Sequence, residues 1–314
     1  MAVTTNAVIA SFGGKLLKLS HKATSTRCEM AFNLYLPPQA FEDPPRRIPV
    51  LIYLSGLTCT ADNCSEKGFF QHGASKNGIA VLYPDTSPRT TPLSFPRCYF
   101  SMPFLMLEPS FEIEPQGGLN IPGENDSWDF GTGAGFYVDA TQKPYHEAYK
   151  MYTYVKEELP NVVFQQFPQL DPERVSITGH SMGGHGALML YLRNPGKYRS
   201  VSAFAPICNP INCPWGQKAF SGYLGENHPD LWKEYDSTEL VKGWKGPLKM
   251  LIDVGTGDNF YKQGQLLPEN FEQAVTEAGV KGLQIRYQPD YDHSYYTMAS
   301  FSDDHIAHAA QYLV

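Results

Sequence analysis

Short apolar runs alternate with amphipathic segments along most of the chain. The runs at 48–54 (IPVLIYL) and 79–83 (IAVLY) have the continuous apolar character of strands that are buried on both faces. Residues 30–36 alternate between apolar and polar positions, as a half-buried strand does. The same reasoning predicts four later strands at 174–178, 200–204, 248–252 and 284–287.

Helical periodicity appears between these strands. It predicts helices at 65–77 with Gly78 as the C-terminal cap, 145–159 ending at Pro160, 182–193 ending at Asn194–Pro195, 267–278 and 295–313. Strands separated by helices of this length predict one α/β domain over 1–314, with a mostly parallel central sheet covered by helices on both faces. Such sheets bind ligands at the carboxyl ends of their strands.

The stretch 90–117 does not follow this pattern. It carries five prolines and shows neither helical nor strand periodicity. Loops of this length are unusual in a compact domain. We therefore expect an irregular insertion that packs poorly against the core.

Composition narrows the class of protein. Hydrophobic residues make up 42% and aromatic residues 13% of the 314 residues, which is typical of a globular chain. The formal net charge is −7 and no basic stripe is present, which argues against nucleic acid as a partner. No apolar run approaches the roughly 18 residues of a membrane-spanning helix, and the first residues lack a signal-peptide pattern. The sequence therefore predicts a soluble, cytoplasmic protein.

Six cysteines raise the question of a metal site. Cys59 and Cys64 have the same C-x4-C spacing as Cys208 and Cys213. Zinc sites favour tighter pairs, and the two pairs lie in unrelated local contexts. We expect free thiols and no metal, because the cytoplasm is a reducing compartment in which thiols usually stay unpaired.

The strongest chemical signal is GHSMG at 179–183, a G-x-S-x-G motif. A predicted strand precedes it and a predicted helix follows, which is the context of a nucleophile elbow. Glycines two residues either side of Ser181 remove Cβ atoms where strand and helix cross. The helix N-terminus then directs free N–H groups toward a developing oxyanion. The alternative is an ordinary serine in a glycine-rich turn.

A serine nucleophile needs a histidine base, and in this fold class the chain order is Ser, acid, His. His293 follows the last predicted strand and precedes the last helix, so it is the best candidate. The other histidines fit less well because they precede Ser181 (His21, His72, His146), flank the elbow and suit packing roles there (His180, His185), occupy a polar turn (His228) or belong to exposed faces of the last helix (His305, His308).

The acid should follow the preceding strand, where LIDVGTGDNF at 251–260 offers two aspartates. Asp253 still lies on the strand, whereas Asp258 follows the turn at its carboxyl end and can reach His293. We favour Asp258 over Asp253. Asp290 and Asp292 are too close in sequence to His293 to be its usual partner.

The oxyanion donors should be two backbone N–H groups, one from Met182 and one from the loop after strand 48–54. Gly56 lets that loop turn so that the N–H of Leu57 can point inward, although an ordinary turn is the alternative. Cys59 follows two residues later. It is expected either near the active site, without acting as a nucleophile, or as a buried apolar filler.

Several stretches together resemble the S-formylglutathione hydrolase family, also called esterase D. They are LSGLTCT (54–60), SWDFGTGAGFYVDA (127–140), GHSMGGHGAL (179–188), APICNP (205–210), CPWG (213–216), AFSGYLG (219–225), GQLLP (264–268) and YDHSYY (291–296). The resemblance implies an α/β-hydrolase fold, the triad Ser181–Asp258–His293, oxyanion donors at Leu57 and Met182, and no cofactor. It also implies a cytoplasmic homodimer that hydrolyses S-formylglutathione to glutathione and formate in formaldehyde detoxification.

The chain departs from that family at 90–117. Family members continue from the equivalent of Ser87-Pro-Arg89 almost directly to the equivalent of Gly118-Leu-Asn120. The extra residues are either a lineage-specific loop or a translated intron, and they enter beside the rim of the expected active site.

Two other functions compete with the thioesterase. One is a general short-chain carboxylesterase, because one serine site can cleave both ester types. The other is a non-catalytic binding protein, which would normally have lost a triad residue. Trp128 and Trp215 lie in matched motifs and are expected either to wall the acyl pocket or to belong to the core.

Overall fold

A computed structural model describes residues 2–44, 46–89 and 118–314. The insertion expected at 90–117 lies outside these residues. Within them, no helix is both long and apolar enough to cross a membrane.

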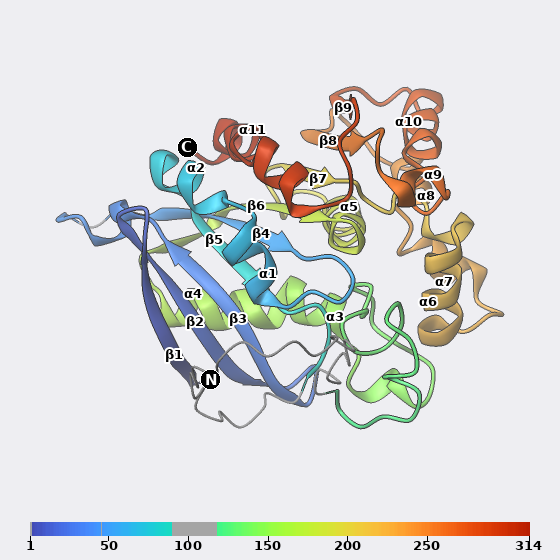
Figure 1. The fold of residues 1–314 in the computed structure, drawn as a ribbon, viewed down its shortest axis with the longest axis horizontal. Helices are drawn as coiled ribbons and strands as arrows, with labels where there is room; N and C mark the ends of the chain where they lie inside the picture. The colour runs from blue at the N-terminus through green and yellow to red at the C-terminus, as the bar shows by residue number, and fades with distance from the viewer. Residues whose placement is uncertain (1, 45, 90–117) are drawn as a thin grey trace, which may run out of the picture.

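One nine-stranded sheet runs through the described residues in the order β1-β2-β3-β5-β4-β6-β7-β8-β9 (Figure 1). The strands are β1 (Val3–Ser11), β2 (Gly14–Ala23), β3 (Cys28–Leu36), β4 (Ile48–Leu54), β5 (Ala80–Pro84), β6 (Leu170–His180), β7 (Val201–Phe204), β8 (Met250–Gly255) and β9 (Leu283–Gln288). All pairs from β5 to β9 are parallel, and β1, β2, β3 and β5 pair antiparallel. The mostly parallel α/β sheet predicted from the sequence is confirmed, with an antiparallel ribbon added at one edge.

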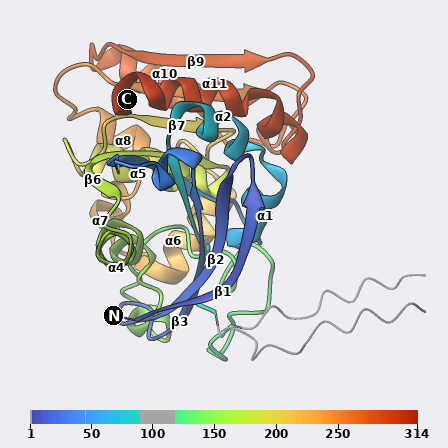
Figure 2. The same cartoon turned by 90° about the vertical axis from the view of Figure 1, so that its left-hand side faces the viewer.

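Helices cover both faces of this sheet (Figure 2). They are α1 (Ala61–Lys67), α2 (Phe70–Asn77), α3 (Met151–Thr153), α4 (Leu159–Gln166), α5 (Met182–Arg193), α6 (Pro214–Leu224), α7 (Pro229–Lys233), α8 (Ser237–Val241), α9 (Asn259–Lys262), α10 (Pro268–Glu277) and α11 (Tyr295–Leu313). Short 3₁₀ turns lie at Pro38–Phe41, Tyr145–Glu147 and Pro210–Asn212, and a π-helical turn at Tyr154–Glu158.

Side-chain alternation along β4 separates the core into two clusters. Leu51 and Tyr53 pack with side chains of α1, α2 and α11, whereas Val50, Ile52 and Leu54 pack with side chains of α4, α5 and α6. A strand buried on both faces needs apolar residues at every position. The continuous run IPVLIYL meets that need, and all seven of its residues are buried.

The helix predicted at 65–77 is divided in two. Its first half begins earlier, at Ala61, where Thr60 and Asn63 form a capping box. The break falls at Gly68 and Phe69, and Phe69 takes a left-handed φ of 58° that no helix continues through. The predicted C-terminal cap is confirmed, since Gly78 has a left-handed φ of 66°.

The prediction of a helix at 145–159 that ends at Pro160 is wrong, both in the type of helix and in where it ends. The segment is a 3₁₀ turn, one short α-helical turn and a π-helical turn. Pro160 does not end the helix, because α4 continues directly from the π-helical turn at Tyr154–Glu158, where hydrogen bonds of the i→i−5 type replace the α-helical ones.

His305 and His308 are buried rather than exposed, which corrects the prediction for the last helix. Their exposed fractions are 0% and 9%. His305 Nε2 lies 3.0 Å from Asp253 Oδ2, and its ring stacks on Phe204 at 3.6 Å between centroids. Asp253 also accepts hydrogen bonds from Arg286 Nε at 2.6 Å and from Gln288 at 3.0 Å. Helix α11 therefore packs through a polar cluster that the sequence pattern does not reveal.

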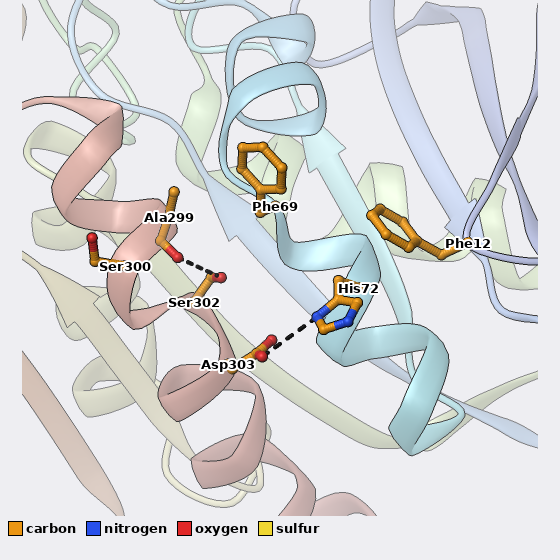
Figure 3. Close-up of a pocket in the computed structure, with 7 residues that line it drawn as sticks. All are labelled: Phe12, Phe69, His72, Ala299, Ser300, Ser302 and Asp303. Atoms are coloured by element: carbon orange, nitrogen blue, oxygen red, sulfur yellow. Dashed lines mark hydrogen bonds and ion pairs between the residues drawn. The ribbon is translucent and has the colours of Figure 1, made fainter.

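Helix α11 also contacts α2 at the surface. Figure 3 shows His72 of α2 pointing toward Asp303 of α11, with Nδ1 and Oδ2 3.4 Å apart. These two residues help to line a shallow cavity of about 360 Å³, together with Phe12 and Phe69. No residue of the predicted active site belongs to its lining.

The polar cluster predicts how stability depends on pH. Burial opposes ionisation of Asp253, but hydrogen bonds from His305 and Arg286 outweigh it and lower its pKa to about 2. A carboxyl group whose pKa falls on folding stabilises the fold above its unfolded pKa of about 3.9, and this contribution is lost as pH falls toward 2. We expect Asp253→Asn to lower the free energy of unfolding at pH 7 by about 2 kcal/mol or more.

Urea unfolding at several pH values measures this effect. The gap between wild type and Asp253→Asn should shrink between pH 4 and pH 2. Asp304→Asn is the matched control, because Asp304 also pairs with Arg286, at 2.8 Å, but from an exposed position. It should change stability by less than about 1 kcal/mol. A gap for Asp253→Asn that does not vary with pH would contradict the argument.

Candidate active site

Ser181 lies at the tight turn between β6 and α5. Its φ of 58° and ψ of −119° are strained for a residue with a side chain. Strand, turn and helix approach so closely that a Cβ on Gly179 would lie 2.2 Å from the Gly183 carbonyl oxygen. A Cβ on Gly183 would lie 2.0 Å from that of Leu54. The turn is fixed further because the N–H of Ser181 donates to the Phe204 carbonyl at 2.9 Å. The structure thus has the geometry that a nucleophile elbow requires.

Asp258 and His293 are joined by a short hydrogen bond. His293 Nδ1 lies 2.5 Å from Asp258 Oδ2. The other oxygen of Asp258 caps α9 by accepting from the N–H of Phe260 at 2.7 Å and that of Tyr261 at 3.3 Å. Asp258 is fully buried. A carboxylate held by two backbone donors can orient the imidazole without itself moving.

The imidazole of His293 packs beside the elbow. Its ring lies 4.5 Å from that of His180, the residue before Ser181, and 4.9 Å from that of Phe260. His180 is buried, its ring nitrogens have no hydrogen-bond partner among the described residues, and burial lowers its pKa well below the usual value. A neutral His180 therefore serves as a packing surface for His293, one residue before Ser181 in the chain.

The second elbow histidine, His185, also packs in the interior. Its Nε2 lies 3.1 Å from the Phe136 carbonyl oxygen. Burial lowers its pKa to about 4, so it stays neutral. The packing roles expected for both flanking histidines match these surroundings.

Asp253, the competing acid, points away from this group. Its carboxylate is occupied by Arg286 and His305 on the face that α11 covers. The structure brings Asp258, not Asp253, to His293.

The loop after β4 meets the elbow directly. A Cβ on Gly56 would lie 3.1 Å from Ser181 Cβ and 3.3 Å from the His180 carbonyl oxygen. Within the described residues, the N–H of Leu57 makes no hydrogen bond. Met182 begins α5, so its N–H has no intrahelical acceptor. Both predicted oxyanion donors are therefore free to bind a substrate oxygen.

Cys59 lies on this same loop, two residues after Leu57. Its Sγ is 3.6 Å from the hydroxyl of Tyr295, whose ring is 6.1 Å from that of His180. Burial raises the pKa of the Cys59 thiol, so it stays protonated at neutral pH and is a poor nucleophile. Cys59 is half-buried, and one aromatic side chain, Tyr295, separates it from His180. Its placement near the active site stays a prediction.

An aromatic series leads outward from His293. Phe260 is followed by Trp215, with ring centroids 4.7 Å apart, and Trp215 by Trp128 at 5.5 Å. Trp215 is 6% exposed, whereas Trp128 is 52% exposed. Trp215 is thus buried and Trp128 lies at the surface, and a role for either in the acyl pocket stays a prediction. The sequence pattern does not single out Phe260, although its place two residues after Asp258 is a usable signal.

A metal centre finds no support in the described part of the chain. No group of three His, Cys, Asp or Glu side chains there could hold a metal ion. Cys64, Cys208 and Cys213 are buried free thiols, and Cys28 and Cys59 are half-buried free thiols.

Comparisons with known proteins point to one family. The Esterase family model matches residues 23–99 and 115–309, so the gap between its two parts falls within the predicted insertion. S-formylglutathione hydrolase of Rattus norvegicus is 50% identical over 96% of this chain and 95% of its own length. That of Arabidopsis thaliana is 47% identical over the same shares. The solved S-formylglutathione hydrolase of Agrobacterium tumefaciens superposes with a TM-score of 0.85 at 39% identity, covering 99% of each chain.

The contact between Gly56 and the elbow yields a prediction. Gly56→Ala should lower kcat for p-nitrophenyl acetate by about 10- to 100-fold, part of the 10²- to 10³-fold loss that follows removal of an oxyanion donor. The added Cβ must push the loop, and with it Leu57, away from Ser181. Steady-state kinetics and the rate of labelling by a fluorophosphonate probe measure this.

Gly243→Ala is the matched control for that variant. A Cβ there would meet only the Leu240 carbonyl oxygen, at 3.8 Å, and its φ is not left-handed. It should leave kcat unchanged. Full activity in Gly56→Ala would show that the loop does not take part in the site.

Proposed function

The chain belongs to the S-formylglutathione hydrolase family, and from this we propose that it is a serine thioesterase that cleaves S-formylglutathione to glutathione and formate. The observation that carries the mechanism is the 2.5 Å hydrogen bond between Asp258 and His293, beside the strained turn that presents Ser181. Ser181, His293 and Asp258 are assigned as nucleophile, base and orienting acid. No cofactor is needed for this chemistry.

Acylation begins when Ser181 Oγ attacks the formyl carbon. His293 takes the hydroxyl proton, and Asp258 holds the imidazole in the tautomer that leaves Nε2 free to accept it. The negative charge that develops on the formyl oxygen is stabilised by the N–H groups of Leu57 and Met182. These donors are in place before the substrate arrives, so no reorganisation is needed as the charge forms.

Collapse of the tetrahedral intermediate breaks the carbon–sulfur bond and leaves a formyl ester on Ser181. Glutathione departs as a thiolate, which is a better leaving group than an alkoxide, so protonation by His293 matters less for breaking the bond. The released thiolate then takes the proton from His293, which restores the neutral imidazole for the second step. His293 then removes a proton from water, and hydroxide attacks the formyl ester. The products of this second step are formate and free Ser181.

The exposed Trp128 and the aromatic series behind it supply a wall for the substrate. Trp128 stands outward from Trp215, and Phe260 connects the series to His293. We assign Trp215 to the acyl side of this wall and Trp128 to the outer side. Aromatic side chains give such a wall contact area at low conformational cost.

A second activity on short-chain carboxylic esters follows from the same site. The match to the Esterase family model favours it. Oxyanion stabilisation and the triad act on the carbonyl group and not on the leaving atom, so aryl acetates should also be cleaved.

The remaining assignments rest on the family. We propose a single domain over 1–314 that acts as a homodimer in the cytoplasm, in formaldehyde detoxification, without nucleic acid or membrane as a partner. The continuous nine-stranded sheet supports the single domain.

The activity test compares kcat/KM on S-formylglutathione and on p-nitrophenyl acetate. We expect the thioester to be preferred. Ser181→Ala should lower kcat on both substrates by about 10⁴-fold or more, while thermal unfolding is unchanged, because the triad acts as a unit. Comparable activity in Ser181→Ala would contradict the mechanism, and a preference for the aryl ester would favour the carboxylesterase.

The choice of acid is tested by comparing two matched variants. Asp258→Asn should lower kcat by roughly 10³- to 10⁴-fold because the imidazole loses its orienting acceptor. Asp253→Asn should act on stability and change kcat little below its unfolding temperature. The reverse pattern would show that Asp253 is the acid.

The position of Cys59 beside Tyr295 predicts that thiol reagents inhibit the enzyme. A bulky group on its Sγ must displace Tyr295 or the loop that carries Leu57. N-ethylmaleimide should therefore inhibit thioester hydrolysis by the wild type. Cys59→Ser should keep most activity and lose this sensitivity. Equal inhibition of the wild type and Cys59→Ser would place the effect at another cysteine.

A further inference from the structure

We propose that Arg89 and Asp85 form a positioning pair that holds the oxyanion loop, residues 55–59, in its active shape. The proposal rests on the proposed function, since it explains how the Leu57 N–H is kept directed at the substrate. Neither residue is assigned to contact the substrate. Both follow β5, a strand that the triad does not use.

The ion pair lies in the interior directly beneath the loop. Arg89 Nε and Asp85 Oδ1 are 2.9 Å apart, and the two residues are 9% and 4% exposed. The same guanidinium donates from Nη2 to the Cys59 carbonyl oxygen at 2.9 Å. Asp85 thus fixes the guanidinium, and the guanidinium fixes the end of the loop.

Thr86 completes the hold on the same carbonyl. Its Oγ1 donates to the Cys59 carbonyl oxygen at 2.5 Å and accepts from Arg89 Nη2 at 3.3 Å. Its own N–H donates to Asp85 Oδ1 at 2.6 Å. One carbonyl of the loop therefore receives two hydrogen bonds from a connected, buried set of three residues.

The carbonyl needs this hold because the residue before it is strained. Thr58 has a φ of 66°, a left-handed conformation that is a genuine outlier for a β-branched residue. Strain of this kind costs about 1–3 kcal/mol and persists only where the surroundings enforce it. Thr58 lies between Leu57 and Cys59, so relaxing it to a negative φ would move Leu57.

A second segment, around Gly133, also holds Thr58 in place. Its N–H donates to the Gly133 carbonyl at 2.9 Å. Gly133 is packed so tightly that a Cβ there would lie 3.0 Å from both Arg89 Nη2 and Thr58 Cα. The N–H of Gly133 in turn donates to Ser87 Oγ at 2.8 Å. Thr58 is thus held between Gly133 on one side and the connected residues Asp85, Thr86 and Arg89 on the other.

Stability alone gives a weak reason for such a pair. Well-packed apolar residues of similar volume often replace a buried ion pair at no cost in stability. The guanidinium instead offers several donors in a rigid plane, which suits simultaneous contact with a carboxylate and a carbonyl. A positioning role explains why charge is placed at this point.

The experiment compares Arg89→Lys and Thr86→Val with Arg174→Lys. Lysine keeps the charge but cannot bind Asp85 and Cys59 in the same fixed geometry. Arg174 is a matched control, because it pairs with Asp171 at 2.8 Å and donates to the carbonyls of Leu313 and Arg47 at 3.0 and 2.6 Å. It lies near the start of β6, and Ser181 follows the other end of that strand.

Kinetics on p-nitrophenyl acetate and fluorophosphonate labelling give the readout, because both use the oxyanion donors. Arg89→Lys should lower kcat and the labelling rate by about 10- to 100-fold, with KM within about twofold. Thr86→Val should lower both by about 3- to 10-fold, and it remains informative if Arg89→Lys fails to fold. Arg174→Lys should shift thermal unfolding without changing kcat.

Two results would overturn the proposal. One is kcat within twofold of wild type in the folded variants of Arg89 and Thr86. The other is an equal loss of kcat in Arg174→Lys, which would indicate a general effect on stability. Failure of the wild type on S-formylglutathione with full activity on the aryl ester would overturn the proposed substrate only, and the comparison of Arg89 variants would still stand.

Discussion

The rest of the site depends on one constraint: at the turn between β6 and α5, backbone segments pack directly against one another at glycines, with no side chain between them. Gly183 lies against the carbonyl of Leu54 at the end of β4, and Gly56 lies against Ser181 itself. The end of one strand, the turn after another and the loop beside them can meet only where Cβ atoms are missing. In the proposed mechanism, that close approach brings Ser181 and the N–H groups of Leu57 and Met182 within reach of one carbonyl group.

The three residues of the proposed triad are each held in place by the surrounding backbone or by packing. Asp258 is fixed by the N–H groups at the start of α9, and Ser181 by the Phe204 carbonyl. His293 depends on packing between His180 and Phe260, together with its bond to Asp258. Rigid placement of this kind matters because electrostatic stabilisation works only where the dipoles need not move during the reaction.

The sequence predicts the parts of the site that are set by local geometry. The glycine spacing around Ser181 predicts the turn, and chain order with strand ends singles out His293 and favours Asp258 over Asp253. The sheet and its six parallel strands, β4 to β9, are predicted from short strand-like runs such as 48–54. What the pattern misses depends on partners distant in sequence, which periodicity does not encode.

His305 shows this limit clearly. On helix α11 alone it is a polar residue suited to solvent, and only Asp253, 52 positions earlier, gives it a buried partner. The break at Phe69 and the placement of Pro160 in a first turn are also tertiary outcomes. Arg89 is hidden for the same reason, because its meaning depends on the Cys59 carbonyl, 30 positions away.

Two ion pairs with a buried carboxylate, Asp253–Arg286 and Asp85–Arg89, lie on opposite sides of the strand that leads to Ser181. The first ties α11 to β8 and β9 and lies outside the site, while the second ends on a carbonyl of the oxyanion loop. Similar chemistry therefore has different consequences, which follow from what the guanidinium touches besides its carboxylate. In this molecule, the Asp85–Arg89 ion pair affects the proposed reaction through the hydrogen bond that Arg89 donates to the Cys59 carbonyl, more than through the ion pair itself.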